Sequence, residues 1–307
     1  MNPAPLAPLR MIRAGVLEVA VHETGPADGS PVFLMHGFPY DIHAYAEVAP
    51  MLAEAGCRVI VPYLRGFGPT RFLSADTPRS GEQAALGADL LALMDAMKVQ
   101  RAVLAGYDWG GRAACVIAAL WPERCSGLVS LNSYNIHDVA RAMEPDLPVN
   151  ERSYWYQYYF QIERGRNGLA AHRRELCRLL WELWSPSWKF DDAAFERSAP
   201  AFDNPDFVDV VIHSYRCRYG LAVCDPAYAD IEARLARLPA ISVPSITFDG
   251  ADDGVRPPAK AEAAAKRFSG PRSHRIVPGA GHNLPQEKPR LFADAVLELV
   301  RGGPIAA

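Results

Sequence analysis

An aspartate stands at the centre of a glycine-framed turn, Gly106-x-Asp108-x-Gly110, directly after the apolar run 102–105. Small residues on both sides allow the backbone to turn sharply and to expose the central side chain, as in the nucleophile elbow G-x-S-x-G. An aspartate carboxylate is already ionised near pH 7, so it can attack a saturated carbon directly, where a serine would first have to lose a proton. The plainer interpretation is a helix N-cap, because an aspartate at a helix start accepts backbone N–H bonds.

A histidine and a pair of aspartates could complete a catalytic set around Asp108. His282 lies in the glycine-rich stretch 279–283, between a predicted strand and the last predicted helix. Asp253 follows an earlier predicted strand in a G-x-x-D-x-V pattern, and the neighbouring Asp252 is the alternative acid. The chain order of nucleophile, acid and histidine is that of enzymes built on a nucleophile elbow. We therefore expect His282 to act as a base that Asp253 orients.

The segment HGFP at 36–39 follows an apolar run, in the position of a loop that supplies a backbone N–H to an oxyanion hole. Phe38 would donate that N–H, and Trp109 would donate the second. Attack by the Asp108 carboxylate on carbon would leave an ester, which water activated by the histidine would then hydrolyse. The two N–H groups would stabilise the oxyanion that develops on the ester during this second step.

Apolar runs bounded by turn residues alternate with stretches of helical periodicity, as in parallel βαβ architecture. The predicted strands are 16–22, 32–35, 58–63, 102–105, 127–131, 241–248 and 274–277, and the predicted helices between and after them are 44–55, 83–97, 111–119, 259–268 and 290–300. Between 134 and 239 the pattern is helical throughout, with predicted helices at 153–163, 169–183, 207–219 and 228–238. Such an insertion predicts a cap over the carboxyl ends of the strands, where α/β folds place their sites. The expected division is 1–133 for the first part of the core, 134–239 for the helical cap and 240–307 for the second part of the core.

Four segments together resemble a known family: the HGFP loop, the GYDWGG elbow at 106–111, the helical insertion and the GAGHN loop at 279–283. The chain is similar to α/β-hydrolases of the epoxide hydrolase and haloalkane dehalogenase group, and more specifically to soluble epoxide hydrolases, from about residue 32 to the final helix. The resemblance implies an α/β-hydrolase fold, with a mostly parallel central sheet flanked by helices and an inserted all-helical cap. It also implies hydrolysis of an epoxide to a vicinal diol through an ester on Asp108, with no cofactor and no metal.

Two tyrosines of the insertion match positions that act on the epoxide oxygen in soluble epoxide hydrolases. Tyr156 begins the stretch YQYYFQ, similar to the family's Y-Q-x-Y-F-Q, and Tyr215 precedes an arginine in SYR. A phenol can polarise the ring oxygen by hydrogen bonding and then donate its proton. An aromatic helix between cap and core would also be buried without catalysis, so packing is the alternative role for Tyr156. The substrate pocket is expected to include Arg112, Trp155, Gln157, Pro39 and His36, of which the last is expected mainly to shape its loop.

Dehalogenation is the main alternative activity, because the same aspartate chemistry can displace a halide. Trp109 could hold a halide, but Phe38 stands where many haloalkane dehalogenases have asparagine. Fluoroacetate dehalogenases share HGFP and resemble the segment from Asp108 to Arg112, although Trp109 replaces the first of their two carboxylate-binding arginines. Arg112 is then either a substrate contact or a surface side chain. A non-catalytic ligand-binding protein on the same fold is a third hypothesis, and the intact set of residues argues against it.

Composition excludes several other classes of protein. The 307 residues are 50% hydrophobic and 22% charged, and their net charge of −3 gives no reason to bind nucleic acid or a membrane. We expect a small apolar or aromatic epoxide as the partner, and a homodimer is compatible with the sequence. Phosphate loops, nucleotide fingerprints and metal-ligand spacings are absent from the sequence, so no cofactor is expected. The six cysteines lack CxxC spacing and the first residues lack a signal pattern, which predicts reduced, mostly buried cysteines and a cytoplasmic protein.

Overall fold

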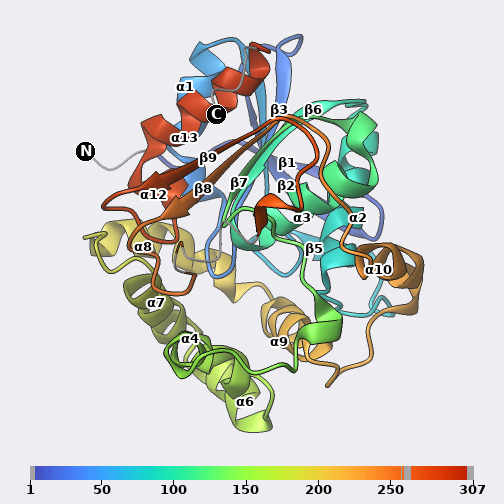
Figure 1. Cartoon of the computed structure of the whole chain (residues 1–307), viewed down its shortest axis with the longest axis vertical. Coiled ribbons are helices and arrows are strands. Elements are labelled where there is room, and N and C mark those ends of the chain that lie inside the picture. Colours follow the sequence, from blue (N-terminus) through green and yellow to red (C-terminus); the bar gives the residue numbers. More distant parts are fainter. Residues whose placement is uncertain (1–3, 257, 259–263, 303–307) are drawn as a thin grey trace.

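The computed structural model describes residues 4–256, 258 and 264–302. Its strands form one sheet in the order β1-β2-β4-β3-β6-β7-β8-β9, with β5 paired to β2 (Figure 1). Their bounds are β1 Leu9–Ala14, β2 Leu17–Thr24, β3 Ser30–Met35, β4 Cys57–Pro62, β5 Arg71–Phe72, β6 Ala102–Gly106, β7 Cys125–Leu131, β8 Ser245–Gly250 and β9 Arg272–Val277. Strands β1, β2 and β5 pair antiparallel, whereas all pairs from β4 to β9 are parallel. This confirms the mostly parallel sheet.

Helices cover both faces of the sheet, which explains why its central strands are apolar along their whole length. Every residue of β6 is buried, as are the last four residues of β3. Helices α1 (Val48–Glu54) and α13 (Pro289–Val300) lie together on one side, and α2 (Gln83–Ala96), α3 (Asp108–Leu120) and α10 (Ala229–Leu235) lie on the other (Figure 1). The remaining α-helices of the described ranges are α4 Pro148–Glu151, α5 Trp155–Tyr159, α6 Glu163–Ala171, α7 Arg173–Trp184, α8 Asp192–Ser198, α9 Phe207–Arg218 and α12 Leu284–Glu287. None of the helices in the described ranges is long and apolar enough to cross a lipid bilayer.

Helices α4 to α10 all belong to the segment between β7 and β8, which contains no strand. In Figure 1, α4, α6, α7 and α9 gather at the end of the molecule away from α1 and α13. Trp181 of α7 ties this segment to the core, because its indole N–H donates a 2.7 Å hydrogen bond to the Pro39 carbonyl. The ring of Phe38 packs against Phe160 and Tyr215 at centroid distances of 6.3 and 5.7 Å. The inserted helices therefore rest on the HGFP loop.

Several predicted elements differ from the structure. Strand β1 was not expected, because it lies at the sheet edge and most of its side chains are exposed, which leaves little apolar alternation. The predicted helix 153–163 is a 3-10 turn at Arg152–Tyr154 followed by α5, and the predicted helix 169–183 is divided into α6 and α7 at His172. Helix α8 was not predicted. The first half of the helix predicted at 259–268, residues 259–263, lies outside the described residues.

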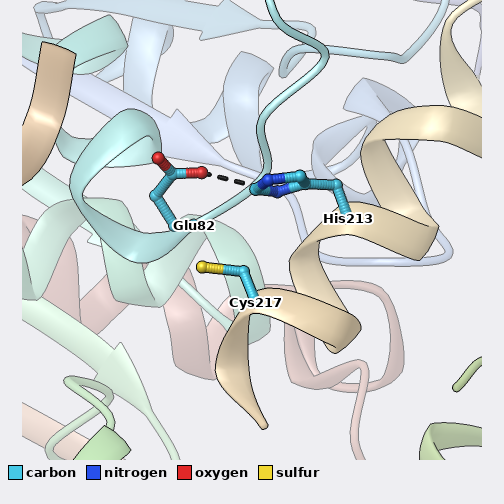
Figure 2. Close-up of side chains that lie close together, drawn as sticks. All are labelled: Glu82, His213 and Cys217. Atoms are coloured by element: carbon cyan, nitrogen blue, oxygen red, sulfur yellow. Dashed lines mark ion pairs between the residues drawn. The ribbon is translucent and has the colours of Figure 1, made fainter. Parts of the chain in front are cut away.

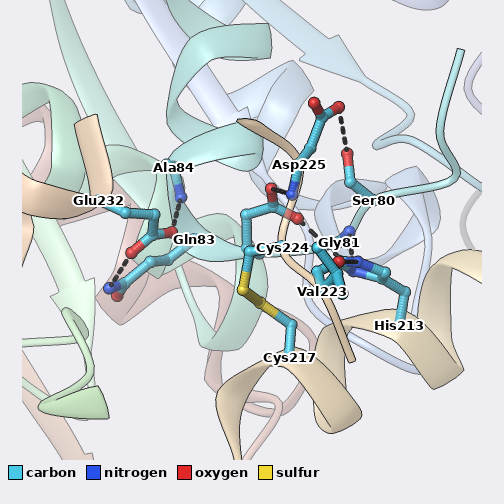
Figure 3. Close-up of a disulfide and its surroundings, with 11 residues drawn as sticks. Ser80, Gly81, Gln83, Ala84, His213, Cys217, Val223, Cys224, Asp225 and Glu232 are labelled. Carbon is cyan, nitrogen blue, oxygen red and sulfur yellow. Dashed lines mark hydrogen bonds and ion pairs between the residues drawn. A yellow bond between two sulfur atoms is a disulfide. The ribbon is translucent and has the colours of Figure 1, made fainter. Parts of the chain in front are cut away.

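A disulfide joins Cys217 to Cys224, which corrects the expectation that all cysteines are reduced (Figure 3). Helix α9 ends at Arg218, and the chain turns back through Gly220 at a φ of +69° to bring Cys224 beside Cys217. The two positions are seven residues apart, a spacing that carries no recognisable signal in the sequence. The inference from cysteine usage to a reducing compartment therefore does not hold for this pair. The other four cysteines, at 57, 115, 125 and 177, are free and buried, as expected.

Candidate active site

Asp108 begins α3, and Tyr107 alone separates it from the end of β6, in a turn that depends on the glycines at 106 and 110. Its backbone has a φ of +49°, a left-handed conformation that residues other than glycine rarely adopt. A Cβ at Gly106 would lie 2.7 Å from the Gly110 carbonyl carbon, and a Cβ at Gly110 would lie 2.0 Å from the Met35 carbonyl oxygen. The glycines therefore allow the strand, the turn and the HGFP loop to approach closely. The N-cap residue of α3 is Tyr107, so Asp108 does not serve as the helix cap.

The Asp108 carboxylate lies against the HGFP loop. Its Oδ1 accepts a 2.8 Å hydrogen bond from the Phe38 N–H. In the described structure the Trp109 N–H makes no hydrogen bond to this carboxylate, although it lies at the N-terminus of the same helix. Burial alone would raise the pKa of Asp108, but His282, Arg112 and the Phe38 N–H outweigh it and lower the pKa below its ordinary value. Asp108 is thus an anion with one N–H donor already in place.

His282 lies between two carboxylates. Its Nδ1 is 2.8 Å from Asp253 Oδ2, and its Nε2 is 3.8 Å from Asp108 Oδ2. The second distance is too long for a hydrogen bond, and Nε2 is buried without a partner in the described structure. Burial lowers the pKa of His282, yet the two carboxylates raise it overall to about 10. Asp252 is exposed and does not contact the histidine, so the geometry selects Asp253 over the alternative acid.

Asp253 is fixed by donors on both of its carboxylate oxygens. The backbone N–H groups of Val255 and Arg256 donate to Oδ1 at 2.9 and 2.8 Å, and the Asn132 amide donates to Oδ2 at 3.0 Å. Sequence reasoning did not identify Asn132. It is the first residue after β7, at the edge of the sheet where α/β folds place functional side chains, and that position is the signal that could have found it.

The loop that carries His282 is held by residues that sequence reasoning also missed. Ser185 Oγ accepts a 3.0 Å hydrogen bond from the His282 N–H and donates a 2.7 Å hydrogen bond to Glu287 Oε1. Glu287 in turn accepts from the N–H groups of Gly281 and Asn283. The glutamate belongs to α12, close to the histidine in the sequence, but the serine belongs to the inserted segment, 97 residues before the histidine, so the local sequence does not link the two.

Tyr156 and Tyr215 lie side by side and buried, at a centroid distance of 5.4 Å and an angle of 88° between the rings. Tyr215 also packs against the rings of Phe38 and Trp109, at 5.7 and 6.3 Å. Burial raises the pKa of both phenols, and the Asp108 carboxylate raises each further. Both are therefore protonated at neutral pH and able to donate a hydrogen bond.

A cavity of about 240 Å³ opens beside Asp108 and His282. Of the expected pocket residues, Arg112 and Gln157 line it together with Tyr156, whereas His36, Pro39 and Trp155 do not. His36 is held within its loop, where its Nε2 accepts from the Leu64 N–H at 3.1 Å and its Nδ1 lies 3.0 Å from the Gly37 carbonyl oxygen. Burial lowers the pKa of His36 to about 4, so it is a neutral structural residue.

Most of the residues that line this cavity are polar or charged, whereas the expected partner is an apolar or aromatic epoxide. Apart from tyrosines, its only apolar members are Ala142 and Val255, and three arginines contribute to it. Other aromatic rings of the insertion pack against one another, as Trp181 does against Trp188 and Phe190. The further lining residues, none of them predicted, are Asn132, Asn135, His137, Asp138, Tyr154, Arg218, Tyr219 and Arg256.

Glu82, His213 and Cys217 are a group of metal-ligand type, with ligand atoms within 4.8 Å of one another (Figure 2). The ligand atoms of His213 and Cys217 are occupied by other contacts. The Cys217 sulfur is in the disulfide, and His213 Nδ1 accepts from the Gly81 N–H while its Nε2 lies 3.0 Å from the Val223 carbonyl oxygen (Figure 3). The group therefore joins α9 to the start of α2 and does not offer a set of free ligands.

Comparisons with known proteins agree with this architecture. The family described as the alpha/beta hydrolase fold matches residues 30–289. Epoxide hydrolase A of Mycobacterium tuberculosis is 28% identical over an alignment that covers 95% of this chain and 97% of the relative. A crystal structure of a candidate epoxide hydrolase from Klebsiella pneumoniae superposes with a TM-score of 0.93 at 48% identity, covering 95% of this chain and 97% of the other. An epoxide hydrolase from Solanum tuberosum, 19% identical with a TM-score of 0.76 over 96% and 99% of the two chains, shares the fold.

Proposed function

Because the chain belongs to the α/β-hydrolase family, we propose that it hydrolyses an epoxide to a vicinal diol through an ester on Asp108. The observation that carries this proposal is the pair of buried, protonated phenols, Tyr156 and Tyr215, packed beside the nucleophile turn. An epoxide oxygen departs as an alkoxide and needs a proton, whereas a halide departs without one. The similarity to proteins named epoxide hydrolases over nearly the whole chain supports the same activity.

In the first step, the Asp108 carboxylate attacks one ring carbon while the bond from that carbon to the ring oxygen breaks. One phenol gives its proton to the oxygen, which becomes the first hydroxyl group of the product. The positive φ of Asp108 and its glycine neighbours present the carboxylate to the substrate, so its orientation does not have to be found anew at each turnover. Helices α5 and α9 of the inserted segment act as the cap that brings the phenols to this carboxylate.

In the second step, water attacks the carbonyl carbon of the ester, and His282 takes a proton from it under the orientation imposed by Asp253. The Phe38 N–H, and the Trp109 N–H once the ester has formed, stabilise the oxyanion. The water oxygen stays on Asp108, and the two protons of the water end on the second hydroxyl of the diol and on the phenolate. The free enzyme is thereby restored.

A dehalogenase is the second candidate, because the indole N–H of Trp109 is buried without a hydrogen-bond partner in the described structure. A buried donor of this kind could stabilise a departing halide. Purified protein should be incubated separately with styrene oxide, glycidol, chloroalkanes and fluoroacetate, while diol and halide are quantified. Diol release without halide release is expected, and halide release with no diol from either epoxide would overturn the proposal.

The ester intermediate has its own test in the variant His282→Gln. This variant should still open the epoxide but not hydrolyse the ester, so intact-protein mass spectrometry should find one substrate mass added at Asp108. The double variant that also carries Asp108→Asn is the matched control and should stay unmodified. Unmodified His282→Gln protein, under conditions where wild type turns the substrate over, would show that the intermediate is assigned wrongly.

A further inference from the structure

Three arginines, Arg112, Arg218 and Arg256, line the cavity beside Asp108. Their hydrogen bonds in the described structure go to neutral amide oxygens: Arg112 Nε to the Asn135 carbonyl at 3.3 Å, Arg218 to Gln157 at 3.2 Å and Arg256 to the Asn135 side chain at 3.1 Å. Within the described ranges, none of the three forms an ion pair with an acidic side chain of this chain. The cavity therefore gathers three arginine charges against the two carboxylates of its wall, those of Asp108 and Asp138.

A second buried arginine, Arg65, differs from Arg112 because its guanidinium binds a carboxylate. Arg65 is 1% exposed, and its guanidinium binds Asp89 through two hydrogen bonds of 2.6 and 2.7 Å. Arg112 is also buried, at 5% exposed, but it lacks an equivalent carboxylate. Burial, together with the charges of Arg218 and Arg256, lowers the pKa of Arg112 to about 9, although Asp108 opposes the change. A buried guanidinium without its carboxylate is unfavourable, so a negatively charged ligand would stabilise this wall.

The positions of the arginines place that negative charge near the reacting atoms. Arg112 lies four residues after Asp108 on α3, and Arg218 lies three residues after Tyr215 on α9. Residues three or four apart on a helix have Cβ atoms about 5 to 6 Å from each other. The guanidinium of Arg218 also stacks over the Tyr215 ring, 4.8 Å from its centroid. An anionic group held by these arginines would thus lie only a few bonds from the carbon that Asp108 attacks.

The remaining polar groups of the cavity are compatible with one small anion. Asp108 and Asp138 are the acidic residues that line it, and the three arginines outnumber them. His137 Nε2 is buried without a hydrogen-bond partner in the described structure, and burial and the arginine charges keep the pKa of His137 well below its ordinary value. Its neutral ring can therefore add a hydrogen bond to a ligand. A planar carboxylate suits guanidinium groups, which bind it with two parallel N–H bonds.

We infer that the substrate is a small epoxide that carries a carboxylate close to its ring, held by Arg112 and Arg218 with support from Arg256. This inference rests on the proposed epoxide hydrolysis and specifies its substrate class. The ring would face Asp108 and the two phenols, while the carboxylate would face the arginine wall. The cavity volume of about 240 Å³ lies just below the usual range for ligand pockets, which suits a small acid.

The test compares glycidate with glycidamide, which has the same ring and nearly the same shape but no charge. A hydrogen-bonded charge in a buried site should favour glycidate in kcat/KM by a factor on the order of 10 to 100. Arg112→Gln and Arg218→Gln should each bring this ratio toward one. Arg166→Gln is the matched control, because it removes the same charge from an exposed arginine of α6 that pairs with Asp209 and does not line the cavity; it should keep the wild-type ratio.

A second measurement separates anion binding from the chemistry. Calorimetry on the wild-type protein should detect binding of cyclopropanecarboxylate, an unreactive analogue of glycidate, and little binding of cyclopropanecarboxamide. Equal hydrolysis of glycidate and glycidamide, with equal binding of the two analogues, would overturn the inference and leave epoxide hydrolysis intact. Selective binding of cyclopropanecarboxylate by a protein that opens no epoxide would uphold the anion site and overturn the proposed function. Failure of cyclopropanecarboxylate to bind would contradict the arginine site whatever the activity.

Discussion

The negative charge of Asp108 helps to keep His282 protonated, and Asp108→Asn should remove that effect. Burial lowers the pKa of His282, but the carboxylates of Asp253 and Asp108 raise it to about 10. Asparagine is close in shape to aspartate and carries no charge. The proposed ester on Asp108 is also uncharged, so the variant reports on the electrostatics of the intermediate in a protein that performs no chemistry.

The size of the effect follows from the 3.8 Å between His282 Nε2 and Asp108 Oδ2. With an effective dielectric constant of about 20, two unit charges at this distance attract by about 4 kcal/mol. Since about 1.4 kcal/mol corresponds to one pH unit, the titration midpoint should fall by about three pH units. His282 would then titrate near neutrality. The histidine is thus expected to become a competent base when Asp108 is esterified.

The assay is an NMR pH titration of protein with labelled histidine, in which the signal of His282 is assigned by its loss in His282→Gln. In wild type, this signal should stay that of the protonated ring up to about pH 9, whereas in Asp108→Asn it should titrate near pH 7. Asp252→Asn removes an exposed carboxylate beside Asp253 and is the control that should leave the wild-type midpoint unchanged. The same midpoint in wild type and Asp108→Asn would refute this electrostatic argument.

Further predictions concern the phenols, the turn and the disulfide. Tyr156→Phe and Tyr215→Phe should each lower the rate of diol formation, and together they should reduce it about 10²- to 10⁴-fold; a double variant with normal kinetics would assign both rings to packing alone. Gly110→Ala should lower the free energy of unfolding by about 1 to 3 kcal/mol, because its Cβ would meet the Met35 carbonyl at 2.0 Å, and unchanged denaturant unfolding would contradict this. Removing the disulfide with Cys217→Ser and Cys224→Ser should lower the same quantity by about 2 to 3 kcal/mol, since it closes a short loop, and an unchanged transition midpoint and slope would contradict that. The His282 contribution to this free energy is fully present below pH 6.5 and is lost as the pH rises through about 10, because folding raises the pKa of His282, and a stability curve flat over this range would oppose it.

The central strands and the nucleophile turn could be predicted because their causes are local. Apolar runs such as those of β3 and β6 indicate strands covered on both faces, and the glycines around Asp108 indicate a turn that a Cβ would block. The inserted helices were harder to delimit. Their aromatic residues give one continuous helical pattern at 153–163. In the structure, the helix that carries Tyr156 has only five residues, and the Tyr156 ring packs against Tyr215 and Trp184.

The supports of the candidate site could not be predicted in the same way. Ser185 lies 97 residues before His282, and Asn132 lies 121 residues before Asp253, yet each is hydrogen-bonded to its partner. A serine or an asparagine at such positions has many possible uses, and only the packing of the insertion onto the core selects one. The disulfide between Cys217 and Cys224 likewise depends on a turn whose direction the neighbouring residues do not specify.

The sequence by itself determined the chemistry that is available: a carboxylate in a nucleophile turn, a histidine, an acid and two tyrosines, in an order that predicts an α/β-hydrolase. These features depend on residue type and on short spacings, which the backbone converts directly into local geometry. Only the tertiary structure determined which charged side chains lie close together. It buries His282 between two carboxylates and brings Arg112, Arg218 and Arg256 to one cavity, where burial strengthens their interactions because water no longer screens them.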